Sequence, residues 1–216
     1  MIADWREKWG QGNFPFLFVQ LPNIGPRATE PVQDQDRWPG IREAQAKALS
    51  LPNTGMATII DVGDPDDVHG KDKMDVGVRL SLIARHLVYG EDIVQTGPTY
   101  ASMKVHGNQA VITFSNAGSG LVIGSPPWTP AGKIPPQSSK LEGFAVAGRD
   151  KKWKWAHARI HGNQVVVWSD PVSRPVAVRY GWADNPRCNL YNQEKLPAAP
   201  FRTDDWETEH PPTARN

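Results

Sequence analysis

Residues 14–21 read FPFLFVQL, a continuous apolar run that stops at Pro22 and Asn23. An apolar run of this length without alternation is typical of a strand that is buried on both faces of a parallel sheet. Residues 56–62 read MATIIDV and predict a second buried strand of the same kind.

A helical segment follows each of the two predicted strands. Residues 38–49 contain the helix formers REAQAKAL, and the pattern ends before Pro52. A second helix is predicted over 76–88, where apolar residues lie largely at helical spacing, and Gly90 closes it. This alternation of strand and helix is typical of a doubly wound α/β sheet, which usually has about five strands. Only two strands are predicted here, which are too few to complete such a sheet. We therefore expect this part to belong to a longer chain.

The first ten residues point the same way. They contain neither a basic segment nor an apolar one, so they do not have the pattern of a signal peptide. Trp5 and Trp9 are spaced to share one face of a helix, and Gly10 is a typical helix end. A chain that opens inside a helix is again expected to be a fragment.

The sequence changes character near residue 93. From there, short alternating apolar segments are separated by Gly, Pro and Asn, as in β-sandwiches. The segments VHGNQAVI at 105–112 and IHGNQVVV at 160–167 lie 55 residues apart, and each predicts a hairpin that turns on Gly-Asn. We predict two domains: residues 1–92 form part of an α/β domain, and residues 93–216 form a β-sandwich-like domain with an extended tail.

The composition excludes several classes of protein. The 216 residues carry 24 Lys and Arg against 23 Asp and Glu, and this balance disfavours nucleic acid as a partner. No apolar run approaches the roughly 20 residues that span a bilayer, so we expect no membrane insertion. The single cysteine, Cys188, excludes an intrachain disulfide and a cysteine zinc site. The 9 tryptophans favour a carbohydrate ligand, because their rings stack on sugars as well as filling cores.

The acidic loop at residues 63–70 is the main candidate site, because ligands of open α/β sheets bind beyond the carboxyl ends of the strands. Asp66 and His69 have the spacing Asp-x-x-His, and a histidine oriented by a carboxylate can act as a general base. Two other interpretations remain open. The loop is then either a solvated segment in which one Asp caps the next helix, or a calcium site formed by Asp64, Asp66 and Asp67. The spacing of these three does not match an EF-hand.

Candidates for a nucleophile are poor. Ser119 lies in the β region, without the strand–turn–helix context of a serine nucleophile. Cys188 has no evident histidine partner and is interpreted as a buried or incidental thiol. The sequence therefore predicts a base and an acid but no nucleophile.

Several stretches together resemble the C-terminal half of the sialate O-acetylesterases, which are carbohydrate esterases of the SGNH (GDSL-like) hydrolase superfamily. The matching stretches run nearly from end to end, and those of the tail are the most specific. They are DWR at 4–6 with Trp9, PFLFVQLPN at 15–23, WP at 38–39, REAQ at 42–45, DVGD at 61–64 with His69, KDK at 71–73, VG at 76–77, RL at 79–80, PVAVRYGW at 175–182, NLYN at 189–192, LPA at 196–198 and PFRTD at 200–204.

The resemblance implies an O-acetyl ester hydrolase with a Ser-His-Asp arrangement and no metal or cofactor. Its substrate would be an O-acetylated sugar, either a sialic acid or a plant polysaccharide such as acetylated xylan, and its location periplasmic or secreted. By resemblance His69 is the general base and Asp66 its acid partner, with Asp64 and Asp67 as alternatives. The family usually has Pro where this chain has Gly70. The family's serine block and its oxyanion-hole Gly and Asn precede the matched region, so we expect the isolated chain to lack most of the rate acceleration.

Two hypotheses from other classes compete with the esterase. In the first, the chain is a non-catalytic carbohydrate-binding β-domain attached to a remnant α/β piece. The candidate sugar platforms are then Trp128, Trp153, Trp155, Trp168 and Trp182, with Trp153 and Trp155 on one strand face as the leading pair. The second is a two-carboxylate glycosidase, which is disfavoured because no motif singles out a carboxylate outside the acidic loop.

Overall fold

The structure is a computed structural model that describes residues 1–33, 37–127 and 138–206. Its α/β part begins with α1 (Ile2–Trp9), which ends at Gly10 in the left-handed conformation, as predicted. The rings of Trp5 and Trp9 stack on one face of this helix, with 6.4 Å between their centroids. Arg6 is buried and donates hydrogen bonds to the carbonyl oxygens of Phe14 and Asn53, so the helix is fastened to the strands that follow.

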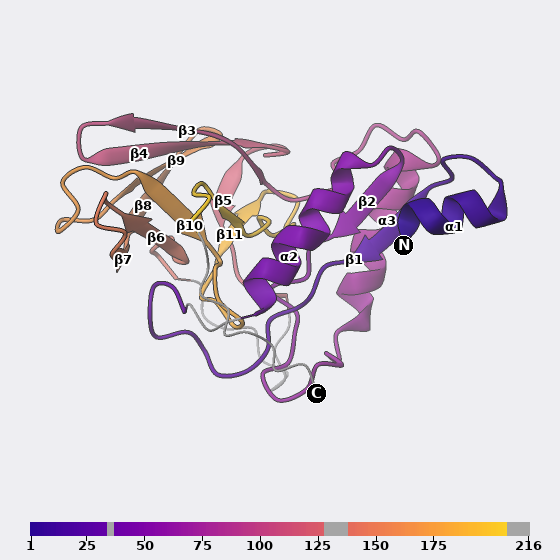
Figure 1. Ribbon diagram of the computed structural model, residues 1–216, viewed down its shortest axis with the longest axis horizontal. Helices are drawn as coiled ribbons and strands as arrows, with labels where there is room; N and C mark the ends of the chain where they lie inside the picture. The colour runs from indigo at the N-terminus through magenta and orange to yellow at the C-terminus, as the bar shows by residue number, and fades with distance from the viewer. Residues whose placement is uncertain (34–36, 128–137, 207–216) are drawn as a thin grey trace.

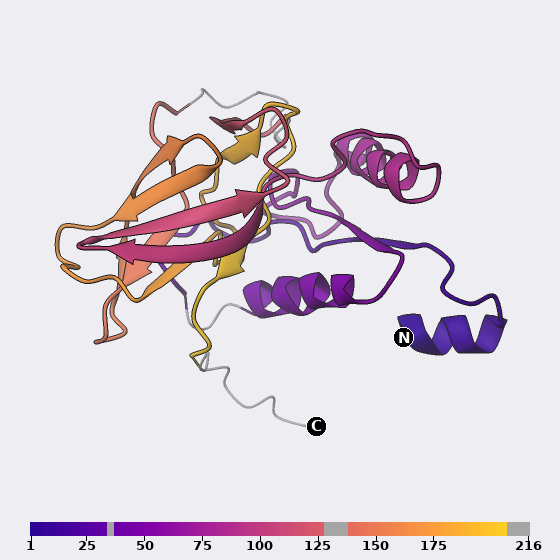
Figure 2. The same cartoon turned by 90° about the horizontal axis from the view of Figure 1, so that it is seen from above.

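Two parallel strands carry the α/β part. β1 (Phe16–Val19) and β2 (Thr54–Ala57) pair in parallel, and α2 (Trp38–Lys47) with the short 3-10 helix η1 (Ala48–Ser50) forms the crossover between them. α3 (Lys73–Leu87) follows β2. Figure 2 shows α2 and α3 on opposite faces of the strand pair. The predicted order of strand, helix, strand and helix is confirmed.

The exposure and the bounds of the strands differ from the prediction. All four residues of β1 are half-buried, whereas burial on both faces was expected. β2 covers residues 54–57 instead of 56–62, so that Ile59, Ile60 and Val62 are buried in a loop. Apolar periodicity reports burial, and these three side chains satisfy it without being paired in a ladder.

The amide of Gln45 on α2 satisfies the backbone at the end of β1. Its Nε2 donates to the carbonyl oxygen of Val19, and its Oε1 accepts from the amide of Leu21. The side chain thereby forms the hydrogen bonds that a neighbouring strand would otherwise form with this backbone, which an edge strand would leave unpaired.

The rest of the chain is a β-rich part with two four-stranded antiparallel sheets and a small two-stranded one (Figure 1). The first sheet has the order β3-β4-β9-β8, the second β12-β10-β6-β7, and the small sheet pairs β5 with β11. The strands are β3 (Thr99–His106), β4 (Gln109–Ser115), β5 (Leu121–Ile123), β6 (Phe144–Ala147), β7 (Trp153–Trp155), β8 (His157–His161), β9 (Gln164–Trp168), β10 (Ala177–Tyr180), β11 (Leu190–Asn192) and β12 (Phe201–Arg202).

The two repeated segments form the predicted hairpins. His106 pairs with Gln109 and His161 with Gln164, so each turn has two residues, Gly-Asn, and each glycine has a φ of 60°. The asparagine that follows each glycine does not have a positive φ, so the turns fit type II′, which has glycine at its first central position. The return strands β4 and β9 lie next to each other in the centre of one sheet, so the repeat is also a repeat in space.

The sandwich core lies between the two larger sheets. Alternate residues of β4 and β9 face alternate residues of β6 and β10, and the cluster continues to Phe201 of β12. Its most buried members include Ile112, Val165, Val146 and Val178, each with no exposed surface. A smaller cluster in the α/β part contains Ala57, Ile59, Val62 and Ile83. This architecture fits the β-sandwich prediction.

Arg42 of α2 joins the α/β part to the β-rich part. Its buried guanidinium donates hydrogen bonds to the carbonyl oxygens of Leu21 and Pro22 on one side and of Ala183 and Asp184 on the other. The two groups of acceptors, one from each part, lie more than a hundred residues apart in the chain. The arginine therefore fixes the position of the α/β part against the segment that follows β10.

Candidate active site

The segments that follow β1 and β2 are held together at one end of the strand pair. The side-chain Oδ1 of Asn23 accepts a hydrogen bond of 2.8 Å from the backbone amide of Gly63. A Cβ at Gly63 would overlap the backbone of Asn23, so only glycine permits this approach. The Nδ2 of Asn23 donates to Asn185, which in turn donates to the carbonyl oxygen of Gly25. The candidate loop is thus anchored at its start.

A buried ion pair supports the same loop from beneath. Asp61 accepts two hydrogen bonds from the guanidinium of Arg79, at 2.5 and 2.8 Å, and a third from the hydroxyl of Tyr191 at 2.9 Å. Burial and the negative charge of Asp61 both raise the pKa of the Tyr191 hydroxyl, which stays protonated as the donor. Burial lowers the pKa of Arg79, but the charge and the hydrogen bonds of Asp61, together with Tyr191 and Asp75, outweigh it, and the net pKa is raised. Arg79 therefore stays charged beside Asp61.

His69 lies at the surface of the loop and contacts Asp67. Its Nδ1 is 3.1 Å from Oδ1 of Asp67, and its backbone amide donates to the same oxygen at 2.8 Å. The pKa of Asp67 is lowered, first by the backbone hydrogen bond from His69 and then by contact with its side chain. The imidazole is 85% exposed, and with Nδ1 facing Asp67 its Nε2 is directed elsewhere. This is the orientation in which a histidine can exchange a proton at Nε2.

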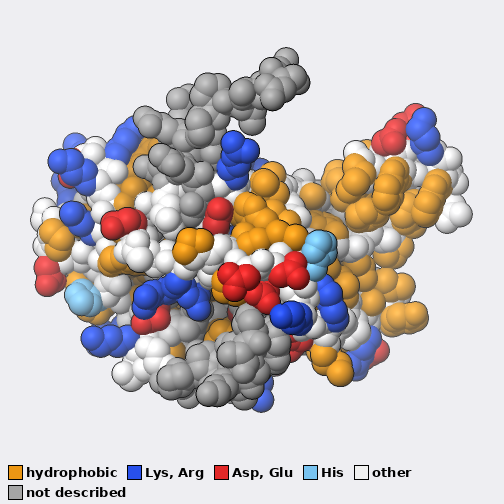
Figure 3. Space-filling view, turned by 90° about the horizontal axis from the view of Figure 1, so that it is seen from below, with side chains coloured by type: hydrophobic (Ala, Val, Ile, Leu, Met, Phe, Trp, Pro, Cys, Tyr) orange, Lys and Arg blue, Asp and Glu red, His pale blue; other side chains and the backbone are white. Residues whose placement is uncertain are grey.

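The other two aspartates of the loop occupy different positions. Asp64 is buried, accepts a hydrogen bond from the amide of Asp66 through Oδ1, and lies 3.6 Å from Nζ of Lys71 through Oδ2. No hydrogen bond joins Asp66 to His69 in the part of the chain that the structure describes. The geometry thus brings His69 together with Asp67, an alternative partner, and not with Asp66, the residue at the Asp-x-x-His spacing. On the face seen in Figure 3, acidic side chains gather beside a histidine.

The structure also bears on the two other interpretations of the loop. The aspartate that caps α3 is Asp72, which follows the loop, and its Oδ1 accepts a hydrogen bond of 3.0 Å from the amide of Asp75. Within the described residues, no three His, Cys, Asp or Glu side chains are grouped so that they hold a metal ion.

Within the described residues, neither of the two nucleophile candidates forms a hydrogen bond with His69. Ser119 donates a hydrogen bond of 2.6 Å from Oγ to Glu194, in an exposed turn of the β-rich part. Burial, followed by the charge of Asp61, raises the pKa of the Cys188 thiol to about 12, so the thiolate is absent at neutral pH. Neither side chain has the activated form that a nucleophile needs.

The predicted sugar platforms separate into different environments. Trp153 packs against Trp206 and lies under the guanidinium of Arg179 at 4.5 Å, while Trp182 is buried against the same arginine. Trp155 instead is 40% exposed. Trp153 and Trp155 therefore do not form a common platform, because the arginine occupies one of the two rings. Trp128 lies outside the described residues.

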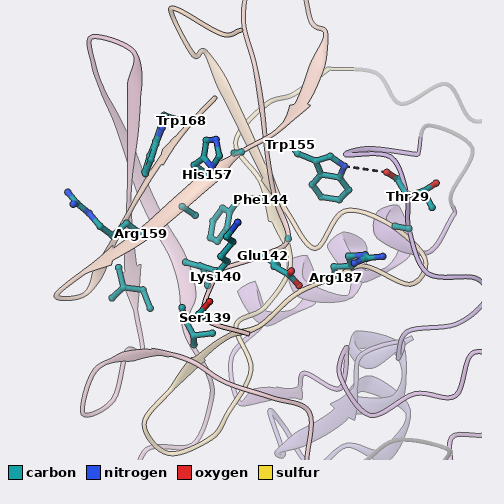
Figure 4. Close-up of a pocket in the computed structure, with 17 residues that line it drawn as sticks. Thr29, Ser139, Lys140, Glu142, Phe144, Trp155, His157, Arg159, Trp168 and Arg187 are labelled. Atoms are coloured by element: carbon teal, nitrogen blue, oxygen red, sulfur yellow. Dashed lines mark hydrogen bonds between the residues drawn. The ribbon is translucent and has the colours of Figure 1, made fainter. Parts of the chain in front are cut away.

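Two cavities adjoin each other between the α/β part and the sandwich. The smaller has a volume of about 280 Å³ and is lined by Asn23, Ile60 and Asp61 together with residues from the β-rich part. The larger, of about 760 Å³, is lined by Trp155, Trp168 and other residues of the sandwich (Figure 4). Glu142 and Arg187 line both cavities. Neither residue lies in a sequence motif, so neither was among the predicted site residues.

Comparison with known proteins shows that the chain is similar to carbohydrate esterases. A crystal structure of a carbohydrate acetylesterase from Xanthomonas citri superimposes with a TM-score of 0.83 at 43% identity, over 95% of this chain and 45% of that one. The chain also resembles the sialate O-acetylesterases of Homo sapiens and Pongo abelii, at 26% identity over 93% of this chain. It spans 40% of the length of these relatives, in their C-terminal part. The resemblance to the sialate O-acetylesterases is confirmed.

No protein-family model matches the chain. Within the described residues, none of the helices combines the length and the apolar character needed to cross a membrane.

Proposed function

We propose that this chain is the C-terminal part of a carbohydrate O-acetyl ester hydrolase that removes acetyl groups from sugar hydroxyls by a Ser-His-Asp mechanism. Its α/β part would be the C-terminal part of a doubly wound SGNH-type sheet, residues 1–92, followed by the β-sandwich-like domain, residues 93–216. The serine and the oxyanion-hole donors would lie outside these 216 residues. The observation that carries the proposal is the contact between His69 and Asp67, on a chain similar to carbohydrate esterases.

His69 would act as the general base and then as the general acid. Its Nε2 accepts the proton of the serine hydroxyl while Oγ attacks the acetyl carbonyl carbon, and it returns that proton to the leaving sugar oxygen. Water then attacks the acetyl-serine, again with His69 as the base, and acetate and free serine are released. Asp67 would hold Nδ1 protonated and stabilise the imidazolium, and its lowered pKa keeps it charged.

Asp66 and Asp64 remain candidates for the acid position. Asp66 has the Asp-x-x-His spacing that the resemblance implies, and it lies in the same loop as His69. Asp64 is buried against Lys71, so its carboxylate is already oriented by another partner. The contact geometry favours Asp67 over both.

Acetate release from 4-nitrophenyl acetate tests the proposal. The chain extended upstream through a serine block should be active, and His69→Ala should abolish the activity, because both proton transfers are lost. His106→Ala, at an exposed hairpin turn, is the matched control and should leave the activity unchanged. Activity in the 216-residue chain itself, or in extended His69→Ala, would refute the proposed mechanism.

A further inference from the structure

The larger cavity is an open groove at one side of the sandwich, where the chain crosses from one sheet to the other. β7 ends at Trp155 and β8 begins at His157, and these two strands are edge strands of different sheets. The groove is closed below by Phe144 of β6 and on one flank by residues 139–143 and Thr29. Figure 4 shows Trp155 and Trp168 toward opposite ends of the groove, with Phe144 and His157 between them.

The rings along the groove are held in place. The indole Nε1 of Trp155 donates a hydrogen bond of 3.3 Å to the carbonyl oxygen of Thr29, although the side chain is 40% exposed. The ring of Trp168 packs against His157 with 5.5 Å between centroids. Rings fixed in this way need little further ordering to stack on the apolar face of a sugar.

The charges around the groove are unbalanced. Lys140, Arg159 and Arg187 line it, against a single carboxylate, Glu142. None of these three cations forms a salt bridge with a carboxylate within the described residues, although the chain as a whole has a formal charge of only +1. Cations without a carboxylate partner beside the exposed ring of Trp155 and the half-buried ring of Trp168 match a ligand that carries both a sugar face and an anionic group.

The groove adjoins the smaller cavity at the end of the strand pair. Glu142 and Arg187 line both, and the smaller cavity is also lined by Asn23, Ile60 and Asp61 of the α/β part. A chain-like ligand in the groove would therefore lie next to the segments that follow β1 and β2.

We propose that this groove binds a carboxylate-bearing glycan, with Trp155 and Trp168 stacking on its sugar rings and Lys140 and Arg187 pairing with its carboxylate. The proposal rests on the proposed function in that it makes this glycan the continuation of the acetylated sugar. The carboxylate can come from a sialic acid or from a uronic acid, since both present the same group to a lysine or arginine. Specificity for acidic glycans would then reside in the sandwich.

Calorimetric titration of the 216-residue chain tests the groove without any ester chemistry. The probes are 3′-sialyllactose against lactose, and glucuronic acid-substituted xylotetraose against xylotetraose. We expect at least one acidic probe to bind at least about tenfold more tightly than its neutral parent, which corresponds to about 1.4 kcal/mol. The arm that binds identifies the source of the carboxylate. Equal binding within both pairs, or no binding of any probe, would overturn the proposal.

Matched variants assign the contacts. Trp155→Ala should weaken binding of the acidic probe about tenfold or more, whereas Trp155→Phe keeps a ring and should retain most of it. Arg187→Gln should abolish the preference for the acidic probe. Trp9→Ala, at an exposed tryptophan on α1, should leave the binding of every probe unchanged.

Unchanged binding of the acidic probe in Trp155→Ala, with thermal unfolding like that of the parent, would refute the proposed binding site. Because no probe carries an O-acetyl ester, loss of esterase activity and loss of binding are separately observable.

Discussion

Asp61 and Arg79 face each other across two hydrogen bonds, with side chains that are 1% and 5% exposed. The pair joins the start of the acidic loop to α3, and Tyr191 extends it to the β-rich part. Replacing only one member of a pair buried to this extent is strongly destabilising, because the remaining charge then has neither an opposite charge nor water around it. The support of the candidate loop therefore depends on a contact that no motif reveals.

Asp61→Asn is expected to lower the free energy of unfolding by about 3–5 kcal/mol, because Arg79 keeps its charge in a buried position. Urea denaturation measures this. The double variant Asp61→Asn with Arg79→Met should lose less than the sum of the two single changes, since it removes the stranded charge as well. Additive losses would show that the two side chains act independently.

Arg42→Lys is expected to lower the free energy of unfolding by about 3 kcal/mol or more. A lysine ammonium cannot reach carbonyl oxygens on both sides of the junction, so buried acceptors lose their donor. Arg85→Lys is the control, because its pair with Glu91 is solvent-exposed and the substitution should hardly change the free energy of unfolding. Similar urea midpoints for the two variants would contradict the proposed role of Arg42.

Gly63→Ala and Gly77→Ala should change stability in opposite directions. A Cβ at Gly63 overlaps Asn23, so the loop must move and the protein is destabilised. Gly77 lies within α3, where a Cβ meets no atom within 4 Å, and alanine there should stabilise by about 1 kcal/mol through helix propensity. Thermal unfolding of the two variants compares them directly, and a stabilised Gly63→Ala would exclude the tight approach to Asn23.

The acid partner of His69 can be separated by kinetics in the extended protein. Asp67→Asn should reduce kcat by at least about 100-fold, since Nδ1 loses the carboxylate that orients it. Asp66→Asn should have a smaller effect, because that carboxylate makes no hydrogen bond to His69 within the described residues. A larger loss in Asp66→Asn than in Asp67→Asn would assign the acid to the Asp-x-x-His position instead.

Asp75 should make stability depend on pH. Burial, followed by the hydrogen bond and the charge of Asp72, raises its pKa from 3.8 to about 6. The folded protein therefore binds this proton more tightly than the unfolded chain, and stability falls as the pH rises from about 4 to about 6. Asp75→Asn should remove this loss and raise the melting temperature at pH 7, whereas Asp92→Asn, at an exposed position, should not. An unchanged pH profile in Asp75→Asn would contradict the raised pKa.

The sequence predicted those elements that depend on neighbouring residues. The Gly-Asn turns at 107–108 and 162–163 require a positive φ that glycine adopts freely, and both hairpins formed as predicted. The bounds of β2 were wrong because the apolar run 59–62 is buried in a loop, and burial alone does not distinguish a loop from a strand. The sequence did not predict that Arg179 covers the ring of Trp153, because the two residues belong to different strands and meet only in the folded protein.

By itself, the sequence determined the order of strands and helices, the two hairpins, the position of the acidic loop and the resemblance to carbohydrate esterases. These follow from local backbone preference, apolar periodicity and motif. Only the tertiary structure decided that Asp67 contacts His69, that Arg79 pairs with Asp61, and that Trp155 and Arg187 border one groove. Some of these contacts join residues far apart in the sequence, so they depend on how the chain folds between them. The contact between Asp67 and His69 depends on the backbone conformation of the loop. Neither is determined by spacing in the sequence.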